Sequence, residues 1–473
     1  MKVALGKPTM PPHAVGPNHL RGTEKFQKAA HHELDNVTKR RNLNYATTTI
    51  RVKRQGAVDE LDDWQDLRTA GSTIKQDVAA RMPELLEEFE RNVTARGGHV
   101  HWARDSKEAN EIIARLVEET GEKNVVKIKS MATQEIALNE ELEKRGIHAQ
   151  ETDLAELIVQ LGEDFPSHIL VPAIHRNRSE IRDIFVAKMP NTDDTLTDDP
   201  QELAEAARVY LREQFMKAKV AISGVNFGVA ETGTVSIVES EGNGRMCLTL
   251  PETLITVMGI EKLLPKYEDF GVFLQLLPRS STAERMNPYT SLWTGVTEGD
   301  GPKNFHIVLL DNGRTAAMSN EIGREALKCI RCSACLNVCP VYERAGGHSY
   351  GSTYPGPIGA ILTPQLTGIE SGDDPNGTLP FASSLCGRCD EVCPVRIPIT
   401  DILLELRHQK VKNETPFLES KAFGTISLLW GKPKLWNRAV RMVALGRVLG
   451  GFNGEIETMP PPISGWTEYR DVA

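Results

Sequence analysis

The sequence lacks the features that define several classes of protein. Its 473 residues contain no stretch of about eighteen or more apolar residues, so no helix is expected to span a membrane. The short apolar run that ends at Leu5 turns polar at once, and it is too short for the core of a signal peptide. The formal net charge is −9, without the basic surplus of a nucleic-acid binder, so we expect no nucleic acid among the partners.

A motif for a hydride-carrying cofactor is missing as well. No G-x-G-x-x-G follows a predicted strand, and no other motif indicates a flavin or nicotinamide site. Because the hydride acceptor is missing, the chain is not expected to be a self-sufficient dehydrogenase. We expect the chain to lie in the cytoplasm. In that reducing compartment, closely spaced cysteines are more often metal ligands or redox groups than disulfides.

Residues 58–310 alternate between helical patterns and short runs of branched apolar residues. Such alternation predicts an α/β domain with a mostly parallel sheet covered by helices. The predicted helices are Pro83–Arg96, Lys107–Thr120, Gln134–Arg145 and Gln201–Lys219. The predicted strands are Val125–Ile128, Ile169–Val171, Val220–Ile222, Val235–Val238 and His306–Leu310.

Basic segments flank this part and the cysteine-rich part behind it. Residues 1–57 are predicted to be a basic N-terminal arm or a loosely docked helix, with a solvated extension favoured over a partner-binding segment. Residues 411–473 form a C-terminal extension that has six basic residues and no acid between Lys421 and Gly454. This tail could lie on an anionic membrane surface through Trp430 and Trp436, or pack on a partner or on the chain itself. Pro433 and the glycines interrupt a continuous amphipathic helix and favour packing.

Residues 311–410 hold seven of the eight cysteines in two runs, followed by a predicted helix at Asp401–Gln409. The first run is C-x2-C-x2-C-x3-C-P, formed by Cys329, Cys332, Cys335 and Cys339. The second run is C-x2-C-x3-C-P, formed by Cys386, Cys389 and Cys393. Two linked runs of this kind predict iron–sulfur clusters, with structural zinc as the alternative.

The spacing also predicts which cysteines share a cluster. In two-cluster ferredoxins the fourth cysteine of a run ligates the other cluster. The rule gives a first site of Cys329, Cys332, Cys335 and Cys393, and a second site of Cys339, Cys386 and Cys389. A full second run would have a cysteine where Ser383 stands, so the second site is short of one thiolate.

The missing thiolate leaves the second cluster open to several forms. It could be a three-iron cluster, a four-iron cluster with serine, water or a partner residue on the fourth iron, or a labile site. Cys247 stands alone in a strand-like setting, and we expect it to be a buried small apolar residue rather than the missing ligand.

Several motifs resemble one bacterial family. They are Gly346–Gly351 and Gly356–Ala360 between the cysteine runs, and Lys129–Met131, Gly146–Ile147, Glu151–Leu154, Pro166–His168 and Gly228 with Glu231–Thr234 before them. With the cysteine runs, these resemble the iron–sulfur subunits of the bacterial lactate utilization system. The resemblance implies an α/β LUD (lactate utilization) domain of the NagB/CoA-transferase-like kind, then a small helical ferredoxin-type domain and a helical tail.

The same resemblance implies a function and partners. The family takes part in oxidising L-lactate to pyruvate, which allows growth on lactate. Its work is shared with a cysteine-rich A-type subunit and a C-type LUD subunit. The implied cofactors are a [4Fe-4S] cluster in the first site and a [4Fe-4S] or [3Fe-4S] cluster in the second, and the family's second run also lacks one cysteine.

The α/β domain offers a few candidates for ligand contact. Lys129 follows a predicted strand at its carboxyl end, where α/β sheets place ligands, and it could contact a carboxylate or phosphate. Backbone N–H groups of the glycine-rich segment Ser223–Gly228 and Glu231–Thr234 could cradle an anion, with Glu231 as an acid or base, although tight-turn geometry explains the segment better. His168, His175 and His306 show no metal-binding spacing, and we expect them to be satisfied by hydrogen bonds.

Three functions are therefore open. The favoured one is an electron-transfer subunit whose clusters pass electrons released elsewhere in a complex. In a second, the LUD domain is itself a catalytic or substrate-binding module. In a third, the clusters are structural, and the chain is a scaffold or a redox sensor.

Overall fold

The computed structural model describes residues 11–369, 372, 374–414 and 417–443. The chain forms two compact units, one of residues 1–369 and 375–404 and the other of residues 370–374 and 405–473. The α/β part and both cysteine runs belong to the first unit. Within the described ranges, no helix is both long enough and apolar enough to cross a membrane.

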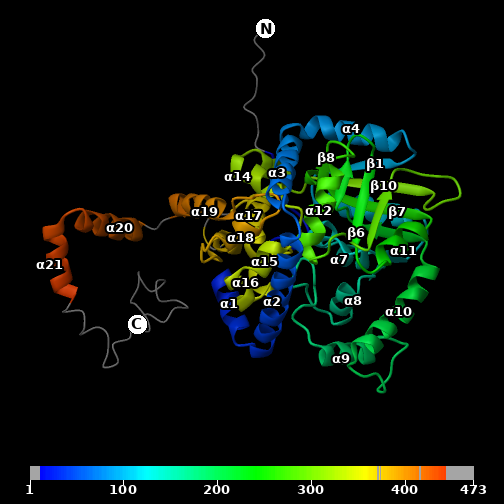
Figure 1. Cartoon of the computed structure of the whole chain (residues 1–473), viewed down its shortest axis with the longest axis horizontal. Coiled ribbons are helices and arrows are strands. Elements are labelled where there is room, and N and C mark those ends of the chain that lie inside the picture. Colours follow the sequence, from blue (N-terminus) through cyan, green and yellow to red (C-terminus); the bar gives the residue numbers. More distant parts are fainter. Residues whose placement is uncertain (1–10, 370–371, 373, 415–416, 444–473) are drawn as a thin grey trace, which may run out of the picture. The chain divides into compact units, whose positions relative to one another are not determined.

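A six-stranded sheet forms the centre of the α/β part (Figure 1). Its strands follow the order β1-β10-β7-β4-β2-β3, and every neighbouring pair is parallel. The strands are β1 His99–Ala103, β2 Asn124–Lys127, β3 His148–Glu151, β4 Val220–Ser223, β7 Thr253–Gly259 and β10 Asn304–Leu310. The predicted α/β fold with a mostly parallel sheet is confirmed.

Both faces of this sheet are buried. Along β10, Phe305, Ile307 and Leu309 join the apolar core on one face, and Val308 and Leu310 join the core on the other. Burial on both sides explains why this strand reads as an almost continuous apolar run. The first core is closed by α4 Met82–Thr94, α8 Leu154–Leu161, α9 Arg178–Lys188, α10 Pro200–Lys217 and α11 Asn243–Thr249. The second is closed by α5 Ser106–Glu118, α6 Met131–Glu135 and α7 Leu138–Glu143.

A second, four-stranded sheet packs into the first core. Its order is β8-β5-β6-β9, with β5 and β8 parallel and the other pairs antiparallel. The strands are β5 Phe227–Val229, β6 Thr234–Glu239, β8 Leu263–Leu264 and β9 Tyr289–Trp293, joined by the short helix η1 Ile260–Lys262 and by α12 Phe270–Ser281. Gly233 turns the chain between β5 and β6 at a φ of +66°, and a Cβ there would lie 2.6 Å from the backbone nitrogen of Val93.

Residues 11–57 are packed rather than solvated, which corrects the favoured interpretation of a solvated extension and agrees with the docked helix that the sequence also allowed. Residues 26–80 form α1 Phe26–Leu34, α2 Val37–Asp59 and α3 Trp64–Ala80. Helix α2 packs on the cysteine-rich helices α15 Ala334–Asn337 and α16 Pro340–Ala345 (Figure 1). Leu43 is completely buried and Arg54 is 6% exposed. The apolar positions are too sparse along α2 to show this face in the sequence, because part of its buried surface is basic.

The cysteine-rich part is built from short helices around one apolar helix. The central helix α17, Gly356–Thr367, is buried over its whole length, which is typical of a helix with no polar face. The other helices of this part are α13 Arg314–Met318, α14 Glu321–Leu327, η2 His348–Tyr350, η3 Pro375–Phe381, α18 Arg388–Val392 and α19 Ile399–Glu414. The helix predicted at Asp401–Gln409 lies within α19 and is confirmed.

Three local predictions are wrong. The helix predicted over Gln134–Arg145 is split at Ala137, whose φ is 53°. Ile169–Val171 is a loop, because the backbone N–H groups of Leu170 and Val171 donate to the imidazole Nδ1 of His168 and not to a neighbouring strand. Cys247 is fully buried as expected, but it lies in helix α11 rather than in a strand.

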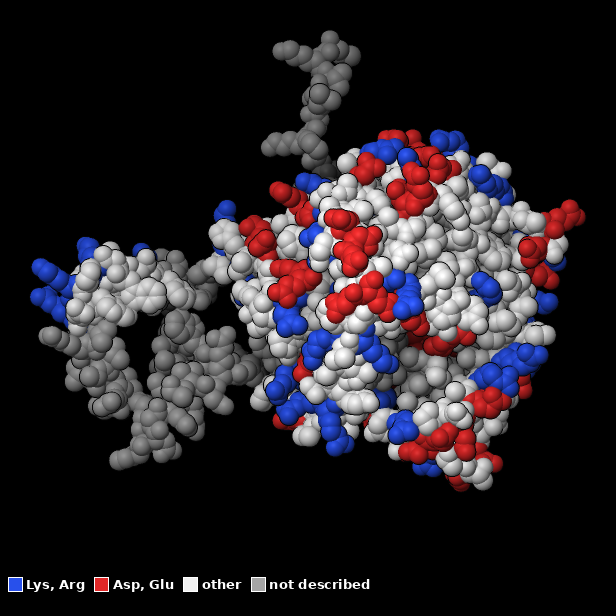
Figure 2. Space-filling model, viewed as in Figure 1, with Lys and Arg blue, Asp and Glu red and all other residues white. Residues whose placement is uncertain are grey.

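The second unit contains two described helices of the tail, α20 Phe417–Trp430 and α21 Pro433–Val443. The indole rings of Trp430 and Trp436 meet edge to face with centroids 5.7 Å apart. Trp430 is 65% exposed and Leu428 is 56% exposed. Figure 2 shows basic residues of this part of the chain on the face in view. The rest of the predicted basic tail, residues 444–473, lies outside the described residues.

Candidate iron–sulfur site

Four cysteines from the two runs surround one small cavity. Cys329, Cys332 and Cys335 reach it from the loop between α14 and α15 and from α15 itself, and Cys393 reaches it from the residue after α18. Apolar side chains close the cavity, among them Ile169 from the α/β part. These are the four residues that the crossover rule assigns to the first site.

The other three cysteines form a second group. Cys339 precedes α16, and its Sγ accepts from the backbone nitrogen of Tyr342 at 3.5 Å. Burial, and beyond it the charge of Cys386, raise the pKa of Cys339, and burial and the charges of Asp390 and Cys339 raise the pKa of Cys389. These mutual effects place the three thiols near one another. Cys339 and Cys389 are buried, whereas Cys386 is exposed.

The backbone around both runs is bent so that N–H groups face sulfur. The nitrogens of Arg331 and Ile397 lie 3.4 and 3.3 Å from the Sγ atoms of Cys329 and Cys393. Among the described residues, eight other than glycine have a positive φ; Arg331 and Ser333 stand in the first cysteine run, and Leu385 and Arg396 flank the second. Such conformations cost roughly 1–3 kcal/mol each and are kept where a site requires them.

The thiols fit an iron–sulfur cluster better than any other use. Burial raises the pKa of Cys332 to about 12 and that of Cys393 to about 11, so without a metal these thiols would be protonated and inert. Iron would deprotonate them on binding. Four convergent thiols with N–H donors aimed at sulfur are the ligand set and the second shell that a four-iron cluster uses. The fit is complete for the first group and one thiol short for the second.

Buried basic residues surround the first group. The Nη2 of Arg54 donates to the carbonyl oxygen of Val392 at 2.9 Å, and the Nε of Arg68 donates to that of Cys393 at 2.9 Å. Lys75 and the partly exposed Lys262 lie near enough for the charge of Cys329 to raise their pKa, although burial lowers it more. In Arg331 burial also lowers the pKa, but the charges of Tyr354, Cys329 and Glu261 outweigh it and raise the pKa overall. A cluster with four thiolates carries net negative charge, and these cations offset it.

The second group has acidic neighbours instead. The charge of Glu343 contributes to the raised pKa of Cys339, and that of Asp390 to the raised pKa of Cys389. The two groups therefore differ in electrostatic setting as well as in thiol number. The sequence did not predict the basic residues around the first group, since Arg54 and Arg68 lie more than 250 residues before Cys329 and become its neighbours only through the fold.

A larger cavity of about 360 Å³ lies at the carboxyl ends of β2, β3, β4 and β7. Lys129, at the end of β2, lines it as the sequence suggested, and its Nζ donates to the carbonyl oxygen of Leu170 at 2.9 Å. Glu231 and Thr234 lie elsewhere, in the second sheet. Glu231 accepts from the backbone of Tyr267, and Thr234 bonds to Thr294. Gly224, Val225 and Asn226 of the glycine-rich turn do line the cavity, and Gly224 packs so closely on Ser130 that a Cβ there would overlap its Oγ.

One wall of this cavity comes from the cysteine-rich part. Arg331 lies between Cys329 and Cys332 and lines both cavities, as does Ile169. The guanidinium of Arg331 pairs with Glu261 at 3.2 Å and stands 4.6 Å from the ring centroid of Tyr354. Glu261 also binds Arg314, which pairs with Glu135 at 2.9 Å. The sheet, the first cysteine run and the linker between the runs are joined by this buried network.

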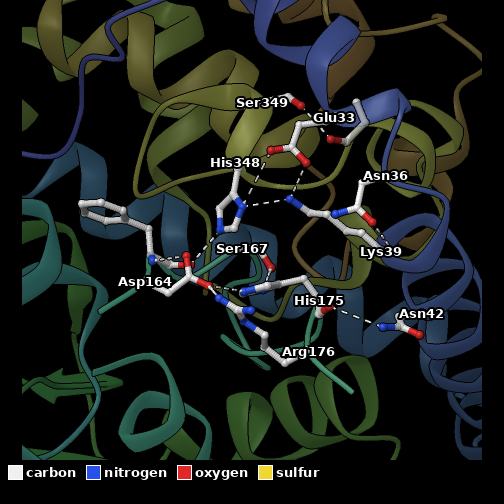
Figure 3. Close-up of polar contacts among 12 residues, drawn as sticks. Glu33, Asn36, Lys39, Asn42, Asp164, Ser167, His175, Arg176, His348 and Ser349 are labelled. Carbon is white, nitrogen blue, oxygen red and sulfur yellow. Dashed lines mark hydrogen bonds and ion pairs between the residues drawn. The ribbon is translucent and has the colours of Figure 1, made fainter. Parts of the chain in front are cut away.

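A second set of polar contacts fastens the loop at residues 164–176 to the linker between the runs (Figure 3). His348 of the linker lies between the Nζ of Lys39, 2.8 Å from its Nδ1, and the carbonyl oxygen of Phe165, 2.7 Å from its Nε2. Lysine only donates and a carbonyl only accepts, so the imidazole is neutral with its proton on Nε2. Burial, followed by the charge of Lys39, lowers the pKa of His348 to about 4.

His348, His175 and Asp164 lie close enough to resemble a metal site, with ligand atoms within 4.8 Å of one another. Hydrogen bonds engage both nitrogens of each imidazole, so neither histidine has a lone pair free for an ion. The Nε2 of His175 is 2.8 Å from Asp164 and its Nδ1 is 2.7 Å from Ser167, while Arg176 also pairs with Asp164 (Figure 3). The expectation that His168, His175 and His306 are satisfied is consistent with the bonds that each makes.

The chain combines two domains that family comparisons define. A model described as the LUD domain matches residues 86–310, and one described as the 4Fe-4S dicluster domain matches residues 325–397. This is a LUD-domain protein with a ferredoxin-type iron–sulfur domain behind it.

Similarity to curated relatives extends over nearly the whole chain. "Lactate utilization protein B" of Bacillus licheniformis is 41% identical over 456 residues, covering 95% of this chain and 94% of that protein. The protein of the same name from Bacillus subtilis is 40% identical with the same coverage, and that from Exiguobacterium sp. is 41% identical over 458 residues, with coverages of 96% and 95%. The chain belongs to the lactate utilization protein B family, and the resemblance seen in its motifs is confirmed.

Proposed function

We propose that this chain is the iron–sulfur electron-transfer subunit of a complex that oxidises L-lactate to pyruvate. The observation that carries the proposal is the gathering of seven cysteines into two adjacent groups, the first lining one cavity with buried cations around it. Family membership supports lactate utilization as the process. The lack of a motif for a flavin or nicotinamide supports a relay rather than a self-sufficient dehydrogenase.

Each group is proposed to hold one cluster. Cys329, Cys332, Cys335 and Cys393 would hold a [4Fe-4S] cluster, and Cys339, Cys386 and Cys389 would hold a [4Fe-4S] or [3Fe-4S] cluster with its fourth thiolate missing at Ser383. A bound cluster accepts and releases one electron at a time. The exposed Cys386 makes the second cluster the one nearer to solvent, and therefore the better exit to a partner.

The remaining parts are assigned accordingly. Residues 58–310 would be the LUD domain and 311–410 the iron–sulfur domain, with 1–57 as a basic segment before them and 411–473 as a C-terminal extension that packs on a partner. The proposed partners are an A-type cysteine-rich subunit and a C-type LUD subunit. The alternative in which the LUD domain itself binds substrate is favoured by one specific feature, the cavity next to the first cysteine group.

The cluster assignment is tested by removing one thiol from the first group. In Cys393→Ser, prepared without oxygen, the EPR signal of the first cluster should be lost while that of the second persists. Cys247→Ser is the matched control, because Cys247 is buried but lies outside both runs. Loss of both signals in the control, or of neither in Cys393→Ser, would refute the assignment.

The relay role is tested by adding L-lactate to the isolated, cluster-loaded chain. The clusters should stay oxidised, and they should become reduced only after a lactate-oxidising partner subunit is added. Reduction of the isolated chain by lactate alone would contradict a pure relay.

A further inference from the structure

The cavity at the carboxyl ends of the parallel strands has one basic residue without a partner. Lys262 lines it from the end of η1, and among the described residues no hydrogen bond or ion pair engages its ammonium. Its side chain is partly exposed, as expected for a group that faces a cavity inside an otherwise buried network. An ammonium in this position lacks the counter-charge that buried charges usually have.

The other charged groups of the cavity wall are already engaged. Asp153 accepts from the backbone nitrogen of Lys129 and from Asn243, and Glu241 accepts from the backbone nitrogen of Leu154. The carboxylate of Glu239 accepts from the backbone nitrogens that follow it. Arg314 is paired with two carboxylates. Among the charged groups of the wall that the structure describes, Lys262 is therefore the one whose side chain has no such partner.

The charge near Lys262 favours a monoanion. Lys262, Arg331 and Arg314 supply three positive charges, and Glu261 and Glu135 supply two negative ones. Of these five groups only Lys262 has no ion-pair partner among the described residues, so a small anion would find one cation unpaired. The acids at the other end of the cavity, among them Asp153 and Glu241, would repel a more highly charged anion. A volume of about 360 Å³ lies within the range of small-molecule sites.

We propose that this cavity binds a small carboxylate, whose anionic group pairs with the ammonium of Lys262 beside the guanidinium of Arg331. The inference rests on the proposed function and deepens it, since lactate and pyruvate both belong to this class. Arg331 places the bound anion against the first cysteine group, because its backbone nitrogen lies 3.4 Å from the Sγ of Cys329. The cavity and the first cluster would then share one wall.

The test is calorimetric titration of the cluster-loaded chain without oxygen, with L-lactate, pyruvate and inorganic phosphate as separate probes. The wild-type chain should bind at least one of the two carboxylates saturably, with a dissociation constant below about 10 mM. This limit is set above the usual range of KM values for substrates. Lys262→Met should weaken that binding about ten- to a hundredfold, the effect of losing a charge-assisted hydrogen bond. Lys262→Arg keeps the charge and should retain most of the affinity.

Lys266→Met is the matched control, because Lys266 is exposed four residues further along and pairs with Glu268. It should bind like the wild type. Iron content and circular dichroism of each variant separate a binding defect from misfolding. If Lys262→Met does not fold, the carboxylate affinity of Lys262→Arg is the measurement that decides.

Absence of saturable carboxylate binding to the wild-type chain would overturn the inference, as would equal affinity in Lys262→Met. Phosphate binding as tight as that of the carboxylates would also overturn it. These failures would leave the relay role untouched, because that role is measured separately by partner-dependent reduction of the clusters.

Discussion

The guanidinium Nη2 of Arg331 lies 3.2 Å from the carboxylate Oε1 of Glu261, which links the first cysteine run to the edge of the LUD sheet. The other carboxylate oxygen of Glu261 binds Arg314. Burial opposes the ionised carboxyl, but the charges of Arg314 and Arg331 outweigh it and hold the pKa of Glu261 at about 2. One buried carboxylate thus holds two arginines from the iron–sulfur side of the fold.

Replacement of this carboxylate by a neutral group of the same shape should destabilise the first unit strongly. Glu261→Gln leaves the buried guanidinium of Arg331 without its carboxylate and Arg314 with Glu135 alone. Breaking a buried pair in this way costs about 3–5 kcal/mol. The free energy of unfolding, measured by urea titration without oxygen, should fall by this amount. Glu268→Gln, which removes only an exposed pair with Lys266, should change it by about 1 kcal/mol or less. Equal effects of the two substitutions would contradict the account.

Supplying the missing thiol should complete the second cluster. Ser383 stands three residues before Cys386, and its Oγ accepts from the backbone nitrogen of Leu385 at 3.1 Å. Ser383→Cys should give a second four-iron cluster, so any EPR signal of an oxidised three-iron cluster in the wild type should disappear. Ser384→Cys is the control, because it adds a thiol one residue out of register. A three-iron signal unchanged in Ser383→Cys would contradict the assignment of this position.

The buried arginines should raise the reduction potential of the first cluster. A positive charge close to a cluster stabilises the reduced form, which carries one more negative charge. Arg54→Gln should therefore lower the potential of the first cluster by roughly 50 mV, equivalent to about 1 kcal/mol. The potential is measured by redox titration followed by EPR. Arg104→Gln, at an exposed position, should leave it unchanged. A rise in potential in Arg54→Gln would contradict the proposed charge compensation.

His348 should make stability depend on pH. Its pKa is about 4 in the folded chain and is usually 6.5, so between these values the unfolded chain binds a proton that the folded chain does not. Stability should thus fall as the pH is lowered through this window. His348→Gln preserves an acceptor for Lys39 and a donor for Phe165 but does not titrate.

Between pH 7.5 and pH 5.5 the wild type should therefore lose about 1 kcal/mol more unfolding free energy than His348→Gln. Urea titrations of both proteins at the two pH values measure this difference, and all other titrating groups cancel in the comparison. The same pH dependence in both proteins would show that His348 is not held neutral in the fold.

Local sequence patterns predicted four of the strands, β2, β4, β6 and β10, and the two cysteine groups, but not β1, β3 or β7. The strand at Val220–Ile222 was predictable because branched apolar residues pack on both faces of a parallel sheet. Spacing alone predicted which thiols share a cavity, since a short loop constrains where its cysteines can point. The close packing of helix α2 was missed because part of its buried face is basic. Arg54 on that face is buried and donates a hydrogen bond to the carbonyl oxygen of Val392, which lies far along the sequence. No pattern within a single segment contains such long-range pairs.

The loop at residues 169–171 shows the same limit. Ile169–Val171 has the composition of a strand, yet His168 takes the backbone N–H groups that a neighbouring strand would need. The ammonium of Lys129 then donates a hydrogen bond to the carbonyl oxygen of Leu170. Ile169 of this loop lines both cavities, and the loop is held by Lys129, which is 41 residues away from Leu170 in the sequence.

The central claim is that two iron–sulfur clusters occupy the two cysteine groups, and counting metal tests it most directly. Chain purified without oxygen should contain about seven or eight iron atoms and a similar number of acid-labile sulfides, the lower value applying to a three-iron second cluster. EPR of the reduced protein should then show two interacting clusters. Zinc in place of iron, with no acid-labile sulfide, would contradict the account.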